Sequence, residues 1–305
     1  MIKKSILQAN FEESLNLEED GFLKLQMEQH NKIAQSYKNG VPSWRFRIRN
    51  FLLTLIFPVG FNYLLQLASV PMMSESKLNF QPSNYNFLTP QVYCLLLGLW
   101  LLLILVGKLF HQSFILPYRY QFHFMTYGIV LYIELDLLVL GLLLSNLHIS
   151  IVIGMMIVWL SLIVFMITRG VGGLRKLIYN EIQESGLREK IAKAIGLYGL
   201  GILGIMIVVQ KVLSLFMENQ SGLLEDLGML LVWMVINVLM PAVIIFVLGP
   251  YFLQGYYKLK YPEAYRKYEM KTLEEWYGKR YLKKHPKLLE KEDYNQTHDH
   301  KEDAI

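Results

Sequence analysis

Apolar residues in this chain occur in long blocks of about twenty, the length of a membrane-spanning helix, separated by short polar connections. The hydrocarbon core of a bilayer is ~30 Å thick and a helix rises ~1.5 Å per residue, so each block is long enough to cross it once. Charged residues make up only 18% of the 305 residues, whereas soluble domains contain about a quarter. The sequence therefore predicts a multi-pass membrane protein.

Six of these blocks are predicted to be transmembrane helices. A segment in hydrocarbon has to satisfy its own backbone hydrogen bonds, and no block alternates with the period of two that an outer-membrane strand requires. The fold class predicted is therefore all-α. In chain order the blocks are Phe51–Val70, Val92–Phe110, Tyr127–Leu147, Ile149–Thr168, a block from near Ile195 that fades toward Phe216, and Leu227–Leu248, which Gly249 and Pro250 close.

Lys and Arg are distributed very unequally between the connections. Residues 1–49 contain eight, 108–126 contain two, 169–194 contain six, and the chain after Pro250 contains twelve. The alternate connections contain only Lys77 and Lys211. Because Lys and Arg are retained in the cytoplasm during insertion, we expect both termini to face the cytoplasm. The expected location is the cytoplasmic membrane, with the lipid bilayer as the main partner.

Three regions are expected on this basis. Residues 1–49 form a cytoplasmic N-terminal segment in which 11–37 is helical, and residues 50–250 form the six-helix transmembrane domain. Residues 251–305 form a basic, aromatic cytoplasmic tail that is compatible with helix as far as Leu289 and becomes disordered after about residue 290.

The connection 169–194 is expected to fold as two short amphipathic helices on the membrane surface. Apolar residues fall on one helical stripe before Ser185 and on another after it. Basic residues lie between them, and such helices bind anionic lipid headgroups. The basic side chains assigned to that surface are Arg175, Lys176, Arg188, Lys190 and Lys193.

Two acidic residues, Glu134 and Asp136, lie inside the third block. An ionisable group costs at least ~2–3 kcal/mol at the centre of a span, which makes it a functional candidate. Two positions correspond to about 200° around a helix, so these two alone cannot form a paired-carboxylate site. In one interpretation either acid carries protons or cations or holds a ligand. In the other they are protonated, or paired with Lys108 or Arg119, and serve packing.

Two spans combine a proline with an amide side chain. Pro58 precedes Asn62 in the first block, and Asn237 precedes Pro241 in the last. Proline removes a backbone donor and kinks a helix, which frees carbonyl groups that need other partners. Kinked spans of this kind occur both at transporter binding sites and as plain packing devices, so both interpretations stay open.

No catalytic residue, metal site or cofactor is predicted. The sequence contains no His-Glu-x-x-His, Gly-x-Ser-x-Gly or Walker motif. Its one cysteine, Cys94, excludes a disulfide framework and a cysteine-based zinc site. The net charge of +5 is small and scattered, which argues against a nucleic-acid partner. We therefore expect a non-enzymatic protein.

Two stretches resemble the tandem five-transmembrane proteins of Gram-positive bacteria. One is the entry to the first span, Leu53-Thr-Leu-Ile-Phe-Pro-Val-Gly-Phe-Asn-Tyr-Leu-Leu65, and the other is the tail motif Glu274-Glu-Trp-Tyr-Gly-Lys-Arg-Tyr281. Some members of that family are immunity proteins against secreted membrane-damaging toxins. The resemblance implies protection of this kind and no catalytic residues. The family is usually assigned five spans, whereas six are predicted here.

Three functions remain as hypotheses. The first is immunity or self-protection against a membrane-active toxin or bacteriocin. The second is a small transporter or the membrane subunit of an exporter, for which Glu134, Asp136, Asn62 and Asn237 would supply the polar path. The third is an intramembrane enzyme acting on lipid or peptide. The sequence predicts neither the partner nor the oligomeric state.

Overall fold

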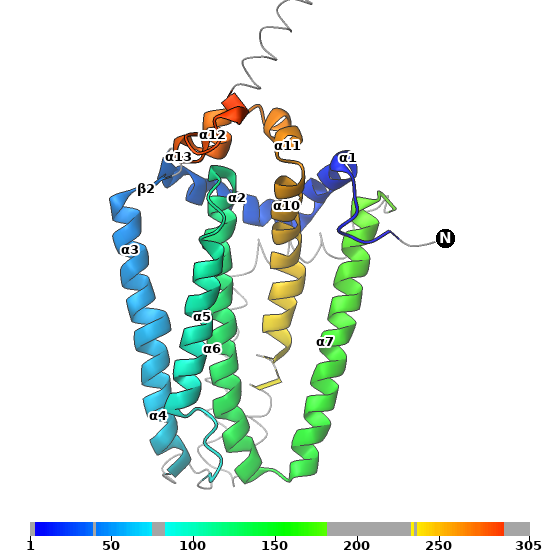
Figure 1. Ribbon diagram of the computed structural model, residues 1–305. Coiled ribbons are helices and arrows are strands. Elements are labelled where there is room, and N and C mark those ends of the chain that lie inside the picture. The colour runs from blue at the N-terminus through cyan, green and yellow to red at the C-terminus, as the bar shows by residue number, and fades with distance from the viewer. Residues whose placement is uncertain (1–3, 39–40, 75–82, 182–232, 235–236, 290–305) are drawn as a thin grey trace, which may run out of the picture.

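The computed structural model describes residues 4–38, 41–74, 83–181, 233–234 and 237–289 (Figure 1). The regular secondary structure of the described part is helical except for one antiparallel pair of two-residue strands, β1 (Tyr37–Lys38) and β2 (Val41–Pro42). The all-α class predicted from the sequence is therefore confirmed.

Five helices in the described residues are long and apolar enough to cross a membrane, which fits the predicted multi-pass protein. They are Trp44–Met73, Pro90–Gly107, Ser113–Ser145, Ile149–Ile178 and Asn237–Lys260. The predicted span from Ile195 toward Phe216 lies outside the described residues, so six spans stay a prediction.

The first and last described spans each contain a π-helical turn, whereas the three described spans between them are α-helical. The first span consists of α3 (Trp44–Thr54), the π turn η2 (Leu55–Phe61) and α4 (Asn62–Ser74), and the last contains the π turn η5 (Val243–Leu248) and α10 (Gly249–Lys260). The others are α5 (Pro90–Gly107), α6 (Leu116–Asn146), which follows the 3-10 turn η4 (Ser113–Ile115), and α7 (Ile149–Ile178).

Three helix ends differ from the prediction. Gly249 and Pro250 do not close the last span, because Pro250 occupies the first turn of α10, where its missing N–H is not needed. The third span begins at Leu116 rather than Tyr127. The fourth continues past Thr168 to Ile178, because Leu174 and Ile178 are buried against protein.

The remaining helices gather at one end of the bundle, here called the polar end (Figure 1). They are α1 (Phe11–Leu15), the 3-10 turn η1 (Asn16–Glu19), α2 (Gly21–Gln35), α11 (Pro262–Tyr268), α12 (Leu273–Tyr277) and α13 (Lys279–Leu282). Asn10 and Asp20 cap α1 and α2 by accepting backbone N–H groups. Helices are thus present in both flanking regions, as predicted.

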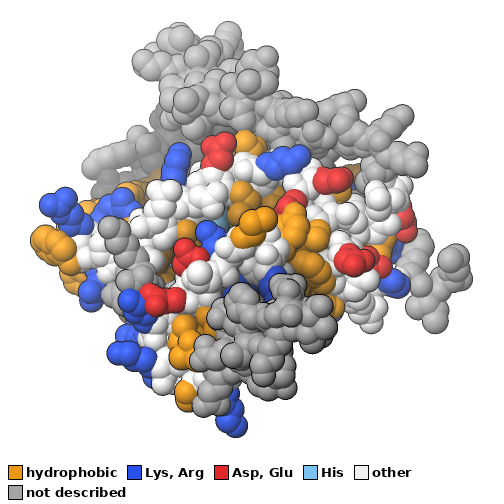
Figure 2. All heavy atoms as spheres, turned by 90° about the horizontal axis from the view of Figure 1, so that it is seen from above, with side chains coloured by type: hydrophobic (Ala, Val, Ile, Leu, Met, Phe, Trp, Pro, Cys, Tyr) orange, Lys and Arg blue, Asp and Glu red, His pale blue; other side chains and the backbone are white. Residues whose placement is uncertain are grey.

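The described basic residues also lie toward this end. No described Lys or Arg lies in the connections at the opposite end, 83–89 and 147–148. Viewed from above, Lys and Arg side chains spread around the polar end, with acidic and hydrophobic groups between them (Figure 2). The charge asymmetry of the sequence therefore corresponds to one physical end of the molecule.

The largest buried cluster is at the polar end and not between the spans. Tyr251, Tyr257 and Tyr265 are completely buried there, together with Trp276 and Ile178. The cluster joins the N-terminal segment, the adjoining ends of α6, α7 and α10, and the tail. It therefore fixes where the spans emerge relative to one another.

Close packing of α10 on α6 at this end yields a prediction. A Cβ added at Gly255 would lie 2.9 Å from Cδ1 of the Tyr118 ring, and that ring is itself buried and cannot move away. We expect Gly255→Ala to lower the free energy of unfolding by ~1–3 kcal/mol, the usual cost of overpacking. Thermal or denaturant unfolding in detergent would measure it.

Gly98→Ala is the matched control, because nothing lies within 4 Å of a Cβ at that position. It should not lower the free energy of unfolding, and the higher helix propensity of alanine should raise it by up to ~1 kcal/mol. Equal losses for both variants would contradict the packing described here.

Candidate functional site

Glu134 lies on the face of α6 that meets α4 and is 1% exposed. Neither of its carboxyl oxygens has a hydrogen-bond partner among the described residues. Asn62, the first residue of α4, is completely buried beside it, yet both atoms of its amide are also unpartnered within that part of the chain. The structure thus brings two of the predicted polar residues together at one point.

Asp136 and Asn237 form a second polar point on the opposite face of α6. Asn237 donates from Nδ2 to Asp136 Oδ1 at 2.6 Å and to the Trp233 carbonyl at 3.0 Å. Its Oδ1 accepts from the Tyr132 hydroxyl at 2.6 Å, and its backbone carbonyl accepts from Trp159 Nε1 at 2.9 Å. Asn237 therefore ties its own helix to α6 and α7, which supports the packing interpretation for this pair.

The predicted pairing of these acids with Lys108 or Arg119 is wrong for the described structure. Lys108 caps the end of α5 and is exposed, and Arg119 donates to the Phe110 carbonyl at 3.1 Å. Because α6 begins at Leu116, Glu134 lies about 27 Å along the helix from its start. Arg119, three residues after that start, is therefore about 22 Å from Glu134 along the helix, and no ion pair between described residues joins Glu134 to Lys108.

The two proline-containing spans depart from α-helical geometry where the sequence predicted kinks. Pro58 lies inside the π turn η2, and Pro241 lies two residues before η5. Gly60 suits the first turn, since a Cβ there would lie 3.1 Å from the Leu55 carbonyl. In addition, the Tyr93 hydroxyl donates to the Val59 carbonyl at 3.0 Å. Side chains of neighbouring spans therefore help to satisfy the irregular backbone.

The predicted membrane-surface helices are corrected in part. Arg175 and Lys176 occupy the last turn of α7, where positive charge complements the helix dipole. The apolar stripe beside them faces the buried cluster and not lipid, because Leu174 and Ile178 pack against the N-terminal segment and the tail. Arg188, Lys190 and Lys193 lie outside the described residues.

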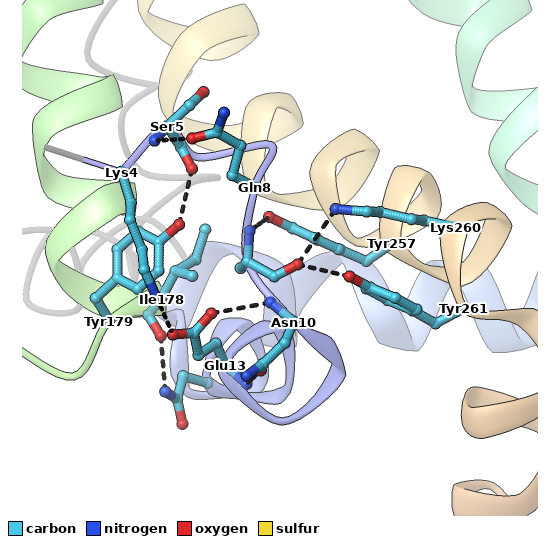
Figure 3. A network of polar contacts seen from close by, with 12 residues as sticks. Lys4, Ser5, Gln8, Asn10, Glu13, Ile178, Tyr179, Tyr257, Lys260 and Tyr261 are labelled. Carbon is cyan, nitrogen blue, oxygen red and sulfur yellow. Dashed lines mark hydrogen bonds and ion pairs between the residues drawn. The ribbon is translucent and has the colours of Figure 1, made fainter. Parts of the chain in front are cut away.

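The sequence did not reveal how the N-terminal strap, residues Ser5–Ala9, is held (Figure 3). The strap crosses the ends of α7 and α10, and the hydroxyls of tyrosines from both helices bind its backbone. Tyr179 donates to the Ser5 carbonyl at 2.8 Å, Tyr261 to the Ala9 carbonyl at 2.9 Å and Tyr257 to the Ile6 carbonyl, while Lys260 Nζ donates to the Leu7 carbonyl at 3.0 Å. The signal for this contact was the recurrence of tyrosine after residue 255 at helical spacing.

Two ionisable groups are buried at the polar end without being catalytic candidates. Lys258 is 3% exposed and forms an ion pair with Glu269 Oε1 at 2.6 Å. His30 contacts the Tyr251 hydroxyl through Nδ1 at 3.0 Å. Burial lowers the pKa of His30 to about 3, and the positive charge of Lys258 contributes to the same direction. His30 is therefore neutral at physiological pH.

The outward face of α7 carries a row of small residues, here called the α7 stripe. Its members lie within about 40° of one another around the helix, at intervals of four and seven residues. Ser161 and Thr168 donate their hydroxyls to carbonyls of α7 itself, at 2.8 Å each, so no polar group of theirs needs an outside partner. The stripe consists of Ser150, Gly154, Ser161, Thr168 and Gly172.

The α7 stripe is open within the described structure. No heavy atom lies within 4 Å of a Cβ built at Gly154 or Gly172. Of the five spans, α7 is the least buried, with 11% of its most apolar window covered by protein. A row of small residues without a neighbour lets another helix approach closely.

The buried His30 makes the polar end sensitive to acid. The unfolded chain binds a proton at this position below a pKa near 6.5, whereas the folded protein does so only near 3. The stability that neutral His30 provides is complete above about pH 6.5 and is lost as pH falls toward 3, by up to ~1.4 kcal/mol per pH unit. Unfolding followed in detergent from pH 7 to about pH 4 should show this slope.

His30→Gln removes the titrating group and retains a side-chain acceptor for Tyr251, so we expect a flatter profile. His285→Gln is the control, because His285 is exposed and should leave the slope unchanged. Parallel profiles for wild type and His30→Gln would contradict this account.

Within the described part of the chain, no three or more His, Cys, Asp or Glu side chains lie together in a way that could hold a metal ion. Comparisons with known proteins add no assignment to this geometry: no family model, no curated protein and no solved structure matches the chain.

Proposed function

We propose that this is a non-enzymatic protein of a bacterial cytoplasmic membrane that protects the cell producing it from a secreted membrane-active toxin or bacteriocin. The observation that carries the proposal is the open α7 stripe. In this proposal the stripe binds a membrane-inserted helix of the toxin, and both termini lie in the cytoplasm.

The stripe suits a helical partner because of the forces that drive helices together in lipid. Lipid tails are as apolar as leucine, so association depends on close van der Waals packing and not on the hydrophobic effect. Small residues permit that packing because they let two backbones approach. The exposed Ile157 and Phe165 lie on either side of the stripe on the same face of α7 and would pack against a helix bound there.

The anchoring of α7 also supports this role. At the polar end, Asn16 Nδ2 donates to the Ile178 carbonyl at 2.8 Å, and Ile178 itself is completely buried. Away from that end, α7 has few described neighbours, and Gly154 lies in open space. The helix is therefore fixed in position at the polar end, while its outer face has no close neighbour at Gly154 among the described residues. A toxin helix held there is removed from the pool that assembles into pores.

The test is protection in living cells. A sensitive strain expressing the protein should keep its membrane potential when exposed to a toxin encoded next to the gene, as followed with a potential-sensitive dye. We expect Gly154→Leu with Ser161→Leu to raise the sensitivity of these cells at least ~10-fold, equivalent to losing ~1.4 kcal/mol of helix packing.

Ile153→Phe adds bulk to an exposed position about 80° away from the middle of the stripe and should leave protection intact. Expression and insertion of each variant would be checked by immunoblot of membranes. Depolarisation that is the same with and without the protein, for every neighbouring toxin, would refute the function. Protection that survives the double substitution would refute the role of the stripe.

Cross-linking identifies the occupant directly. Gly154→Cys in a Cys94→Ser background leaves one thiol, on the stripe. A disulfide to a cysteine placed in the toxin helix supports the proposal. A disulfide only between two copies of this chain would instead assign the stripe to self-association and contradict toxin binding there.

A further inference from the structure

Glu134 is surrounded by protein but by no counter-charge. No ion pair between described residues includes it, and both of its oxygens lack hydrogen-bond partners there. It lies about 18 Å along α6 from the helix end at Asn146, well inside the span. A bare carboxylate at such a place is strongly disfavoured, because the described side chains supply neither a positive charge nor a hydrogen-bond donor to replace its lost hydration.

Asn62 faces the same point from α4. Its amide provides one acceptor and two donors, and all of them lack partners within the described chain. Gln66, one turn further along α4, is buried as well. Buried polar groups are nearly always satisfied, so an unpartnered acid beside an unpartnered amide points to something that joins them.

A proton meets that requirement. A protonated carboxyl group has one O–H donor and one carbonyl acceptor, and a primary amide offers the complementary pair. We propose that Glu134 and Asn62 form an intramembrane proton-binding site. With the proton bound, the Glu134 O–H donates to Asn62 Oδ1 while Asn62 Nδ2 donates to the other carboxyl oxygen. The proton comes from water and returns to it, and its release leaves a carboxylate that accepts only from Nδ2.

The neighbouring groups favour a proton over a metal ion. Hard metal cations take about six oxygen ligands, whereas the described groups here offer the two carboxyl oxygens and Asn62 Oδ1. The phenols of Tyr93 on α5 and Tyr127 on α6 lie close enough to Glu134 to be affected by its charge. Phenols are neutral near pH 7, and the Tyr93 hydroxyl is already donated to the Val59 carbonyl.

The site adjoins an irregular piece of backbone. Asn62 directly follows the π turn η2, whose last residue is Phe61, and its own N–H bonds to the Phe57 and Val59 carbonyls. The Tyr93 hydroxyl binds the same Val59 carbonyl. Forming or breaking the pair of hydrogen bonds between Glu134 and Asn62 therefore affects the backbone where its α-helical geometry is already interrupted. Such π-helical interruptions are frequent at functional sites. This inference does not depend on the protective function.

Infrared difference spectroscopy of the full chain in lipid vesicles tests the site. We expect the wild type to show, near neutral pH, the C=O band of a protonated carboxyl group, which moves to lower frequency in D₂O and is lost as pH is raised. Glu134→Gln should abolish the band completely. Asp136→Asn is the matched control, because Asp136 is hydrogen-bonded to Asn237 elsewhere on α6, and it should leave the band in place.

Asn62→Leu keeps the acid and removes its partner, so the band should move to higher frequency as the C=O loses its hydrogen bond. This variant tests the pair of hydrogen bonds even if Glu134→Gln fails to fold. The proposal is overturned if the wild type shows no protonated-acid band at any pH, or if the band survives Glu134→Gln. It is also overturned if adding sodium at fixed pH removes the band, which would make this a metal-cation site.

Discussion

Burial of tyrosine side chains at the polar end is the interaction on which the arrangement of the spans depends. Between helices in lipid there is no hydrophobic driving force, and the five described spans bury only 11–33% of their most apolar windows in protein. At the polar end, by contrast, Tyr251, Tyr257 and Tyr265 are completely buried. Their rings contribute area and their hydroxyls bind the N-terminal strap, His30 and Ser14. The flanking regions thus hold the membrane helices in place.

Inside the bundle, the candidate polar residues are of two kinds: those whose side chains have hydrogen-bond partners and those whose side chains have none among the described residues. Asn237 has partners for both ends of its amide, and Asp136 accepts from it, so that pair is a structural connection. Glu134 and Asn62 lack such partners within the described chain. Since the two acids point to opposite faces of α6, this helix carries both the structural contact of Asp136 with Asn237 and the proposed proton-binding site at Glu134. A single continuous polar path through all four residues, as transport would require, is not how the described side chains are arranged.

Features that the bilayer imposes as a solvent were predictable from the sequence. The helical class, the multi-pass character and the clustering of Lys and Arg at one end are present in the structure. The divergence of Glu134 and Asp136 was also predictable, because helix geometry alone decides it. Helix ends were wrong where tertiary contacts prolong a helix into water, as at Ile178 and Lys260. The contacts of the strap and the proximity of Glu134 to Asn62 were not predictable, since both bring together residues far apart in the chain.

The two parts of α7 carry side chains of different size because their surroundings differ. At its polar end α7 carries large apolar residues, Leu174 and Ile178, because the hydrophobic effect stabilises their burial against the flanking regions. Within the span, burying a larger side chain gives no such stabilisation, since lipid solvates an isoleucine as well as protein does. A stripe of Gly, Ser and Thr on the outer face therefore loses no stability relative to larger apolar residues while that face contacts lipid. It gains packing only when another helix lies against it, which is the basis of the proposal that a stripe left open by the described residues binds a helical partner.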